Sequence, residues 1–180
     1  DVHGDTEAWG PSLKLDGSNN PIVAWEEENS SGVSNIYVKR WSGTAWVSVG
    51  SGLSSKNSYD ASLALDVANN PVVAFQEYDG NNSNVTVKKW NGSSWATLAS
   101  ILDITSTNLT NLPSLALDNK GYPMVGWSER NTNDNRSSVY VKRYVSNGWQ
   151  PLGSAVDVTL TNETLNSSIT HKSNNRPVVA

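Results

Sequence analysis

Three aromatic pairs, each spaced five residues apart, are the side chains of this sequence best suited to hold a ligand. They are Trp41 and Trp46, Trp90 and Trp95, and Tyr144 and Trp149. Each pair flanks a short polar turn, where amphipathic rings can stack on a sugar. The same rings also fill gaps between packed sheets, because a Trp or Tyr buries about 150–250 Å². The spacing is therefore compatible with packing between sheets or with carbohydrate stacking at these six positions.

Charged side chains recur with the same regularity. Glu27, Glu77 and Glu129 each stand two residues after a strand aromatic, and Lys39, Lys88 and Lys142 lie on the strand that follows. Paired carboxylates can perform acid–base chemistry. A set that is repeated in every copy argues against a single catalytic centre, however, and favours cross-strand ion pairs. We therefore predict no catalytic residue and no enzymatic activity.

Metal ligands and cofactor motifs are poorly represented. The sequence has no Cys and only two His, His3 and His171, which form no recognisable triad. Asp16, Asp66 and Asp118 precede Asn- and Gly-rich turns, where a carboxylate caps turn N–H groups. The segment from Asp79, "DGNNSN", faintly resembles a calcium loop but lacks the closing bidentate Glu. The sequence predicts no metal site and no cofactor.

Asparagine sequons are frequent. Eight positions fit Asn-x-Ser/Thr, and most fall in predicted loops, where a glycan would face water. Either glycosylation or a merely polar loop composition explains them. The eight positions are Asn29, Asn81, Asn84, Asn91, Asn108, Asn135, Asn162 and Asn166.

The charge balance limits the partners. Thirteen Lys and Arg against seventeen Asp and Glu give a net charge of −4, without a basic block. Such a chain is a poor binder of nucleic acid or of anionic membranes. No stretch approaches eighteen apolar residues, so no membrane insertion is expected.

These residues must be positioned by a repeated β unit. "SLALDVANNPVVAF" in the second copy has counterparts in all the others, and Pro21, Pro71, Pro123 and Pro177 mark one equivalent point at spacings of 50, 52 and 54 residues. Each unit is predicted to form four short strands, at about 12–16, 22–27, 36–41 and 46–49 in the first copy. Four antiparallel strands per repeat are typical of a β-propeller blade. The fold class is therefore all-β, in blades at about 11–60, 61–112, 113–166 and, as a partial copy, 167–180.

The second strand of each unit is apolar on both faces, as an inner strand between stacked blades should be. We expect Trp25, Phe75 and Trp127 to be buried there between blades. About three and a half blades are present, whereas a ring closes with roughly four to eight. The missing strands of the last blade are expected from residues beyond 180, from another copy, or from 1–9. The 180 residues are thus expected to be one repetitive domain of a larger propeller.

The repeats resemble a large group of secreted bacterial and archaeal propellers with Leu-Asp-x-x-Asn/Gly-x-Pro and Trp-Asn-Gly-x-x-Trp motifs. Two propeller families share part of the pattern. The Asp-box of sialidase-like propellers is not matched, because Asp16 lies nine residues before Trp25 rather than five. Fucose-binding propeller lectins are similar in the aromatic pairs, but Val38, Val87 and Val141 stand where those lectins carry a sugar-binding Glu.

This resemblance implies an extracellular or cell-surface protein. We expect a non-enzymatic binding or scaffolding module that contacts glycans or surface proteins. One alternative is a building unit of a surface appendage or filament. Another is the non-catalytic part of a carbohydrate-active, sialidase-like enzyme. The expected partners also include the remainder of the propeller, from the same longer chain or from another copy.

Overall fold

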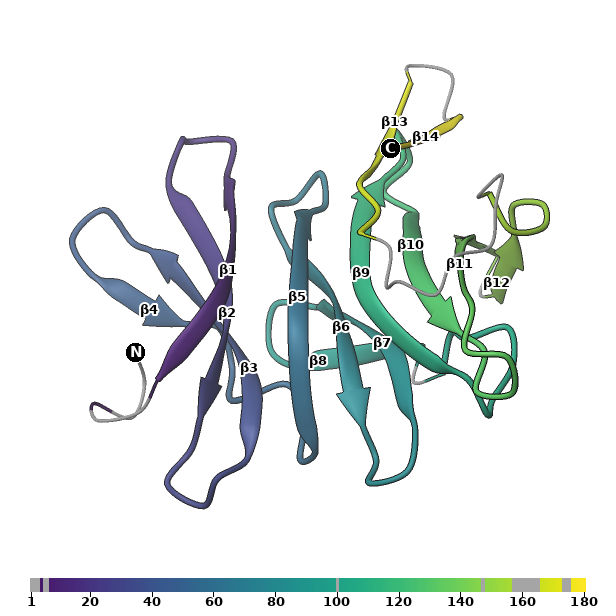
Figure 1. Cartoon of the computed structure of the whole chain (residues 1–180). Helices are drawn as coiled ribbons and strands as arrows, with labels where there is room; N and C mark the ends of the chain where they lie inside the picture. The colour runs from purple at the N-terminus through teal and green to yellow at the C-terminus, as the bar shows by residue number, and fades with distance from the viewer. Residues whose placement is uncertain (1–3, 5–6, 100, 147, 157–165, 173–175) are drawn as a thin grey trace.

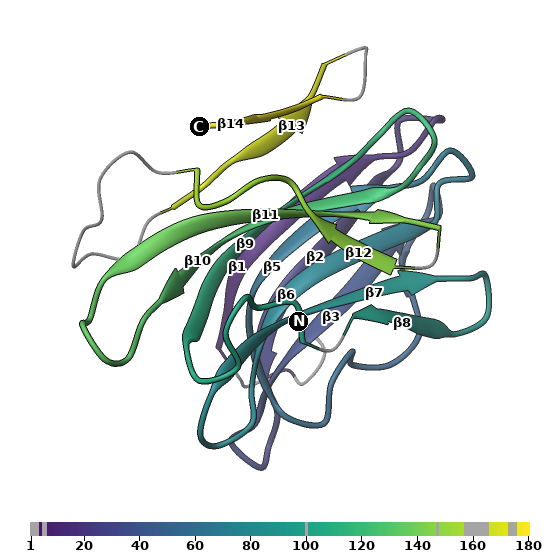
Figure 2. The same ribbon diagram turned by 90° about the vertical axis from the view of Figure 1, so that its right-hand side faces the viewer.

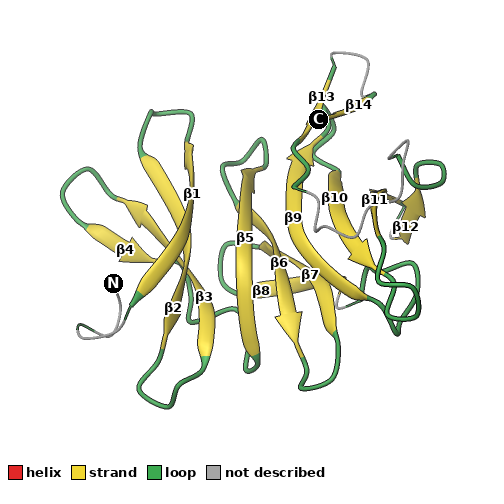
Figure 3. Cartoon of the chain, in the orientation of Figure 1, coloured by secondary structure: helices red, strands yellow, loops and turns green. Residues whose placement is uncertain are grey.

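A computed structural model describes residues 4, 7–99, 101–146, 148–156, 166–172 and 176–180. Within these ranges the chain forms strands and turns without any helix, as Figure 3 shows. No helix in the described residues is therefore long and apolar enough to cross a membrane. The all-β prediction is confirmed.

The strands form four antiparallel sheets that follow chain order. The first sheet has the order β1-β2-β3-β4, the second β5-β6-β7-β8, the third β9-β10-β11-β12, and the last is the β13–β14 hairpin. The bounds are β1 Ala8–Leu15, β2 Pro21–Glu28, β3 Ser34–Trp41, β4 Trp46–Ser48, β5 Asn57–Leu65, β6 Pro71–Tyr78, β7 Ser83–Trp90, β8 Trp95–Ala99, β9 Leu109–Leu117, β10 Pro123–Arg130, β11 Ser137–Val145, β12 Gly148–Pro151, β13 Ile169–His171 and β14 Pro177–Val179.

The sheets stack as propeller blades. Figure 1 shows β1, β5 and β9 side by side as the inner strands of successive blades. The β13–β14 hairpin follows the third blade, with β13 beside β9 (Figure 2). About three and a half blades of four antiparallel strands are present, as the repeat predicted. The residues at 8 and 9 belong to β1, where Ala8 pairs with Glu27 and Trp9 with Glu26, so they do not complete the last blade.

Each inner strand begins three or four residues before the repeat detected in the sequence. The register shifts between Trp9 and Ser12 in the first blade and between Tyr59 and Ser62 in the second, which marks a β-bulge. The third blade has the same shift opposite Gly126–Ser128. A bulge interrupts the alternation of side chains. The residues of each inner strand that precede the bulge also differ between copies, so the sequence repeat does not include them.

Asp16, Asp66 and Asp118 cap the turns between the first two strands of each blade, as predicted. Asp16 Oδ1 accepts the N–H groups of Ser18 at 2.8 Å and Asn20 at 2.9 Å. Hydrogen bonding, first from the Asn20 N–H, lowers the pKa of the Asp16 carboxyl below its ordinary value. The turn also needs a left-handed residue, supplied by Asn19 at φ 62° and by its equivalents Asn69 and Gly121.

Apolar side chains from neighbouring blades form the core. One cluster joins the first and second blades, another joins the second and third, and a small one joins β10, β11 and β13. Trp25, Phe75 and Trp127 are 7%, 0% and 0% exposed, so their predicted burial is confirmed. The inner strands are also linked by serines. Ser12, Ser62 and Ser114 each accept the backbone N–H of the next blade's inner strand, at 2.9–3.0 Å.

Gly50 offers a test of how tightly the blades pack. A Cβ added there would lie 2.9 Å from atoms of Trp90 and Trp95, and its φ is +72°. The equivalent Gly153, at φ +89°, has open space around the same position. Gly153→Ala should cost only the backbone strain of about 1–2 kcal/mol. Gly50→Ala should cost about 1–3 kcal/mol more, because it overpacks the blade interface. Equal urea midpoints for the two variants would contradict this packing.

Candidate functional site

A cavity of about 320 Å³, called the axial cavity below, opens among the inner strands β1, β5 and β9 and residues 166–168 before β13. Its lining repeats from blade to blade: a bulge residue is followed by one or two small residues. Asp60 supplies a carboxyl group to this lining, and Asn166 and the serines supply neutral polar groups. The full lining is Gly10, Pro11, Asp60, Ala61, Ser62, Leu112, Pro113, Ser114, Asn166, Ser167 and Ser168.

Asp60 occupies a strained position in this lining. Its φ of 56° lies in the left-handed region, where the equivalent residue of the first blade is a glycine, Gly10, at φ 55°. A side chain in this region costs about 1–2 kcal/mol. The equivalent Leu112 of the third blade has the same backbone, at φ 52°, so the strain belongs to the repeated bulge and Asp60 differs by the carboxyl group that it carries. The Asp60 carboxylate accepts the backbone N–H of Leu112 in the next blade, which fixes its direction.

A second carboxyl group, from Glu26 on β2, lies next to Asp60 and outside the lining of the cavity. Glu26 accepts the backbone N–H of Asp60, and its pKa is raised first by burial and then by the negative charge of Asp60. Burial also raises the pKa of Asp60, against the opposing effect of the Leu112 N–H. Carboxyl groups with raised pKa values remain protonated closer to neutral pH and can serve as general acids.

Sequence reasoning missed this carboxyl pair because it looked for motifs present in every copy. Glu26 is replaced by Gln76 and Ser128 in the later blades, and Asp60 by Leu112 in the third. The pair therefore occurs once, as a catalytic centre would. A search for charged residues that depart from the repeat would have found it.

The pair makes the stability of the chain depend on pH in a definite direction. A carboxyl group whose pKa is raised by folding contributes stability below its unfolded pKa, and this contribution is lost as the pH rises through the folded pKa. Glu26→Gln should therefore raise the urea midpoint at pH 7 and change it little at pH 4. Glu28→Gln, at the end of β2, is the control. Equal gains at both pH values for Glu26→Gln would contradict the proximity of the two carboxyl groups.

The aromatic pairs lie at the outer part of the blades. Trp41–Trp46, Trp90–Trp95 and Tyr144–Trp149 are edge-on pairs with ring centroids 5.3–5.7 Å apart. Trp95 Nε1 donates to the Val49 carbonyl at 2.9 Å, and Trp149 Nε1 donates to the Leu98 carbonyl at 3.0 Å. The second and third pairs thus pack against the preceding blade. Carbohydrate stacking at the six residues stays a prediction.

In the second and third blades the repeated Glu and Lys side chains bond to the loop that enters the blade. Glu129 also acts electrostatically on Lys142, so the two charges lie near each other as expected, but their hydrogen bonds go to the loop. Glu129 accepts the N–H groups of Ile104 at 2.8 Å and Thr105 at 2.9 Å. Lys142 Nζ donates to the carbonyls of Leu102 and Asp103, both at 2.9 Å. Hairpin register alone could not reveal these partners, because they belong to another blade.

The sequons divide by exposure. Asn84 and Asn108 are buried, and Asn108 Nδ2 donates to Glu129 at 3.0 Å, so neither side chain has room for a glycan in this fold. Asn162 lies outside the described residues. Glycosylation at the other positions, Asn29, Asn81, Asn91, Asn135 and Asn166, stays a prediction. In the "DGNNSN" loop, Asp79 Oδ1 accepts the N–H groups of Asn81 and Asn82 at 3.0 and 2.9 Å and so caps the turn.

Comparison with known proteins identifies the fold. The sequence matches no protein-family model and no curated protein. Among solved structures, an α-L-arabinanase from Penicillium chrysogenum, complexed with arabinobiose, has a TM-score of 0.63 at 13% identity over 96% of this chain. A thermostable family-43 glycoside hydrolase has a TM-score of 0.61 at 11% identity over 93% of this chain. The chain spans 58% and 62% of the lengths of these two proteins.

A fucose lectin from Kordia zhangzhouensis, in complex with methyl-fucoside, has a TM-score of 0.52 at 13% identity. The match covers 81% of this chain and 99% of the lectin. Such identities establish the β-propeller fold alone. They support neither a sialidase-like repeat nor any narrower family.

These neighbours contradict the expectation of a non-enzymatic binding or scaffolding module, and with it the expectation that the chain is not an enzyme. Glycoside hydrolases predominate among the similar folds. The expectation relied on carboxylates that recur in every copy, and Glu129 of that set is bonded to a blade-connecting loop. The Glu26–Asp60 pair does not recur, so the repeat gave no signal for it.

Proposed function

We propose that this chain supplies blades and an acid group to a carbohydrate-active β-propeller of the glycoside hydrolase type. The observation that carries the proposal is Asp60, a strained carboxyl group with a raised pKa that lines the axial cavity. The predominance of glycoside hydrolases among similar folds supports it. An extracellular location would give such a site access to polysaccharides, and it remains a proposal.

Asp60 would act as the general acid. Its proton passes to the glycosidic oxygen while the bond from that oxygen to the sugar carbon breaks. Water then adds its hydroxyl group to the sugar carbon and releases its other proton to solvent, from which Asp60 is protonated again. Glu26 does not line the cavity, so it is a positioning residue. Glu26 accepts the Asp60 N–H and so helps to hold the bulge that presents the Asp60 carboxyl group. Burial is what raises the pKa of Asp60.

The cavity also limits the substrate. A volume of about 320 Å³ is at the lower end of ligand pockets and suits one or two sugar rings rather than a thick polymer. The serine hydroxyls in the lining, together with Asn166, offer hydrogen bonds to sugar hydroxyl groups. Arabinose-containing glycosides are the substrate class that we propose, since arabinanases and an arabinofuranosidase share the fold.

A hydrolysis assay tests this function. The protein is incubated with 4-nitrophenyl α-L-arabinofuranoside and with linear arabinan, and nitrophenolate and new reducing ends are measured. We expect release from at least one of the two, dependent on Asp60. Binding of arabino-oligosaccharides without any hydrolysis would overturn the proposal, and so would hydrolysis that Asp60→Asn leaves unchanged.

A further inference from the structure

Leucines of the blade-connecting loops fill a socket on the next blade. Leu53, between the first and second blades, packs against Val73 and Phe75 and is 2% exposed. Leu102, between the second and third, packs with Trp127 in the same way and is 1% exposed. Four residues before each leucine, Val49 and Leu98 supply the carbonyls that accept a Trp indole N–H from the blade being entered.

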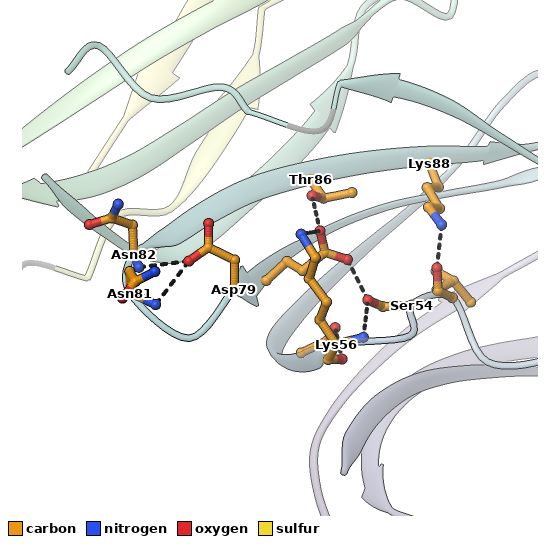
Figure 4. A network of polar contacts seen from close by, with 10 residues as sticks. Ser54, Lys56, Asp79, Asn81, Asn82, Thr86 and Lys88 are labelled. Carbon is orange, nitrogen blue, oxygen red and sulfur yellow. Dashed lines mark hydrogen bonds and ion pairs between the residues drawn. The ribbon is translucent and has the colours of Figure 1, made fainter. Parts of the chain in front are cut away.

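Polar contacts hold the same loops in place. In the second blade, Lys88 Nζ donates to the Leu53 carbonyl, and Ser54 Oγ donates to Glu77. Figure 4 shows Ser54 and Lys88, each with a dashed line to its partner. In the third blade, Lys142 and Glu129 hold the loop that carries Leu102. The blade therefore holds each loop through three contacts: an apolar socket for the leucine, a lysine that donates to a backbone carbonyl, and a Trp indole N–H that donates to another carbonyl.

Among the described residues, the first blade has the equivalent socket with a cavity of about 320 Å³ in the place of the leucine. Val23 and Trp25 form its floor, and Trp9, Lys39 and Trp46 form its walls. These residues correspond to Val73, Phe75, Tyr59, Lys88 and Trp95 of the second blade.

The side of the first blade that carries this cavity also has more exposed apolar side chains than the same side of the later blades. Leu13 on β1 is 56% exposed, whereas the equivalent Leu63 and Leu115 are 1% and 6% exposed. Trp9 and Trp46 are also exposed. Among the described residues, Leu13 is thus uncovered where its equivalents are buried, and Trp9 and Trp46 are exposed where Tyr59 and Trp95 are half-buried, which marks an interaction surface.

We infer that this face receives the connecting loop of a further blade of the same repeat type, with an apolar-x₃-Leu sequence. The Leu side chain would fill the cavity over Val23 and Trp25, and the indole N–H of Trp46 would donate to the carbonyl four residues earlier. Lys39 would bind the carbonyl of that leucine, as Lys88 does for Leu53. The inference does not depend on the proposed hydrolase activity.

A peptide of the chain's own loop tests this surface. The 180-residue protein, with ¹⁵N-labelled tryptophan, is titrated with an unlabelled peptide of residues 46–56. We expect saturable shifts of the indole N–H signals of Trp46 and Trp25, with the Trp46 signal moving downfield, while the signal of the buried Trp127 stays in place. The same peptide carrying Leu53→Asp should give at least tenfold weaker shifts.

Protein variants complete the test. Val23→Glu places a charge on the floor of the cavity and should abolish the shifts, whereas Lys14→Glu, an exposed lysine on β1 outside the cavity, should preserve them. Equal shifts with both peptides, or with Val23→Glu, overturn the inference. Shifts of the same signals by arabinobiose alone would assign the face to a sugar, and shifts that grow with protein concentration alone would assign it to a second copy. Either result overturns the loop assignment.

Discussion

Asp60→Asn should slow glycoside hydrolysis by about 10²–10⁴-fold, the usual contribution of a positioned general acid. The amide keeps an oxygen that can accept the Leu112 N–H, so the bulge should keep its shape. It has no proton of suitable acidity to give to the leaving oxygen. Burial raises the pKa of the Asp60 carboxyl and so penalises its charged form, and a neutral amide in its place should not lower the stability of the folded chain at neutral pH.

The control for this result is Asp79→Asn. Asp79 is a carboxylate of the same blade that caps an exposed turn, and it does not line the axial cavity. Its replacement should leave the rate of hydrolysis within about twofold, which is well below the loss expected of a general acid. A comparable loss of activity in both variants would show that charge or folding, rather than acid catalysis, explains the effect. Urea unfolding of both variants separates these causes.

Trp127→Ala should lower the free energy of unfolding by about 3–5 kcal/mol. Trp127 is wholly buried between the second and third blades, where it packs with Leu102 and Val125. Its Nε1 donates to Glu129 at 3.2 Å, so truncation also removes a hydrogen bond from a buried carboxyl group. Urea denaturation of the purified variant measures the change.

Trp46→Ala is the matched control for Trp127, because the same residue type is removed from the uncovered face of the first blade. Trp46 is 45% exposed, so much less apolar area returns to water and the loss should be at most about half as large. Equal losses at the two positions would show that the blade interfaces do not provide the core of the chain.

The architecture was predictable because its signals are local and repeated. The prolines Pro21, Pro71, Pro123 and Pro177 each start the second strand of a unit, as their spacing predicted. The carboxylates before each turn cap it. The aromatic of the second strand is buried because that strand is covered on both faces. Each of these features depends on residues only a few positions apart.

The partners between blades were not predictable in the same way. Glu129 is bonded to the N–H groups of residues about 25 positions earlier, and Ser62 is bonded to Leu115, 53 positions later. A repeat pattern shows that equivalent residues share a role, but it does not show which loop they touch. Asp60 was missed for the opposite reason: it is a departure from the repeat, and its left-handed backbone follows from a bulge that alternation does not indicate.

The most direct test of the central claim is a crystal structure of the Asp60→Asn variant soaked with arabinobiose, since loss of the acid should leave the sugar uncleaved. We predict electron density for the disaccharide in the axial cavity, with a glycosidic or hydroxyl oxygen within hydrogen-bonding distance of the residue 60 side chain and with Asn166 or the lining serines bonded to the remaining hydroxyl groups. Density for the sugar only on the aromatic pairs, such as Trp41 and Trp46, with the axial cavity holding water alone, would contradict the account.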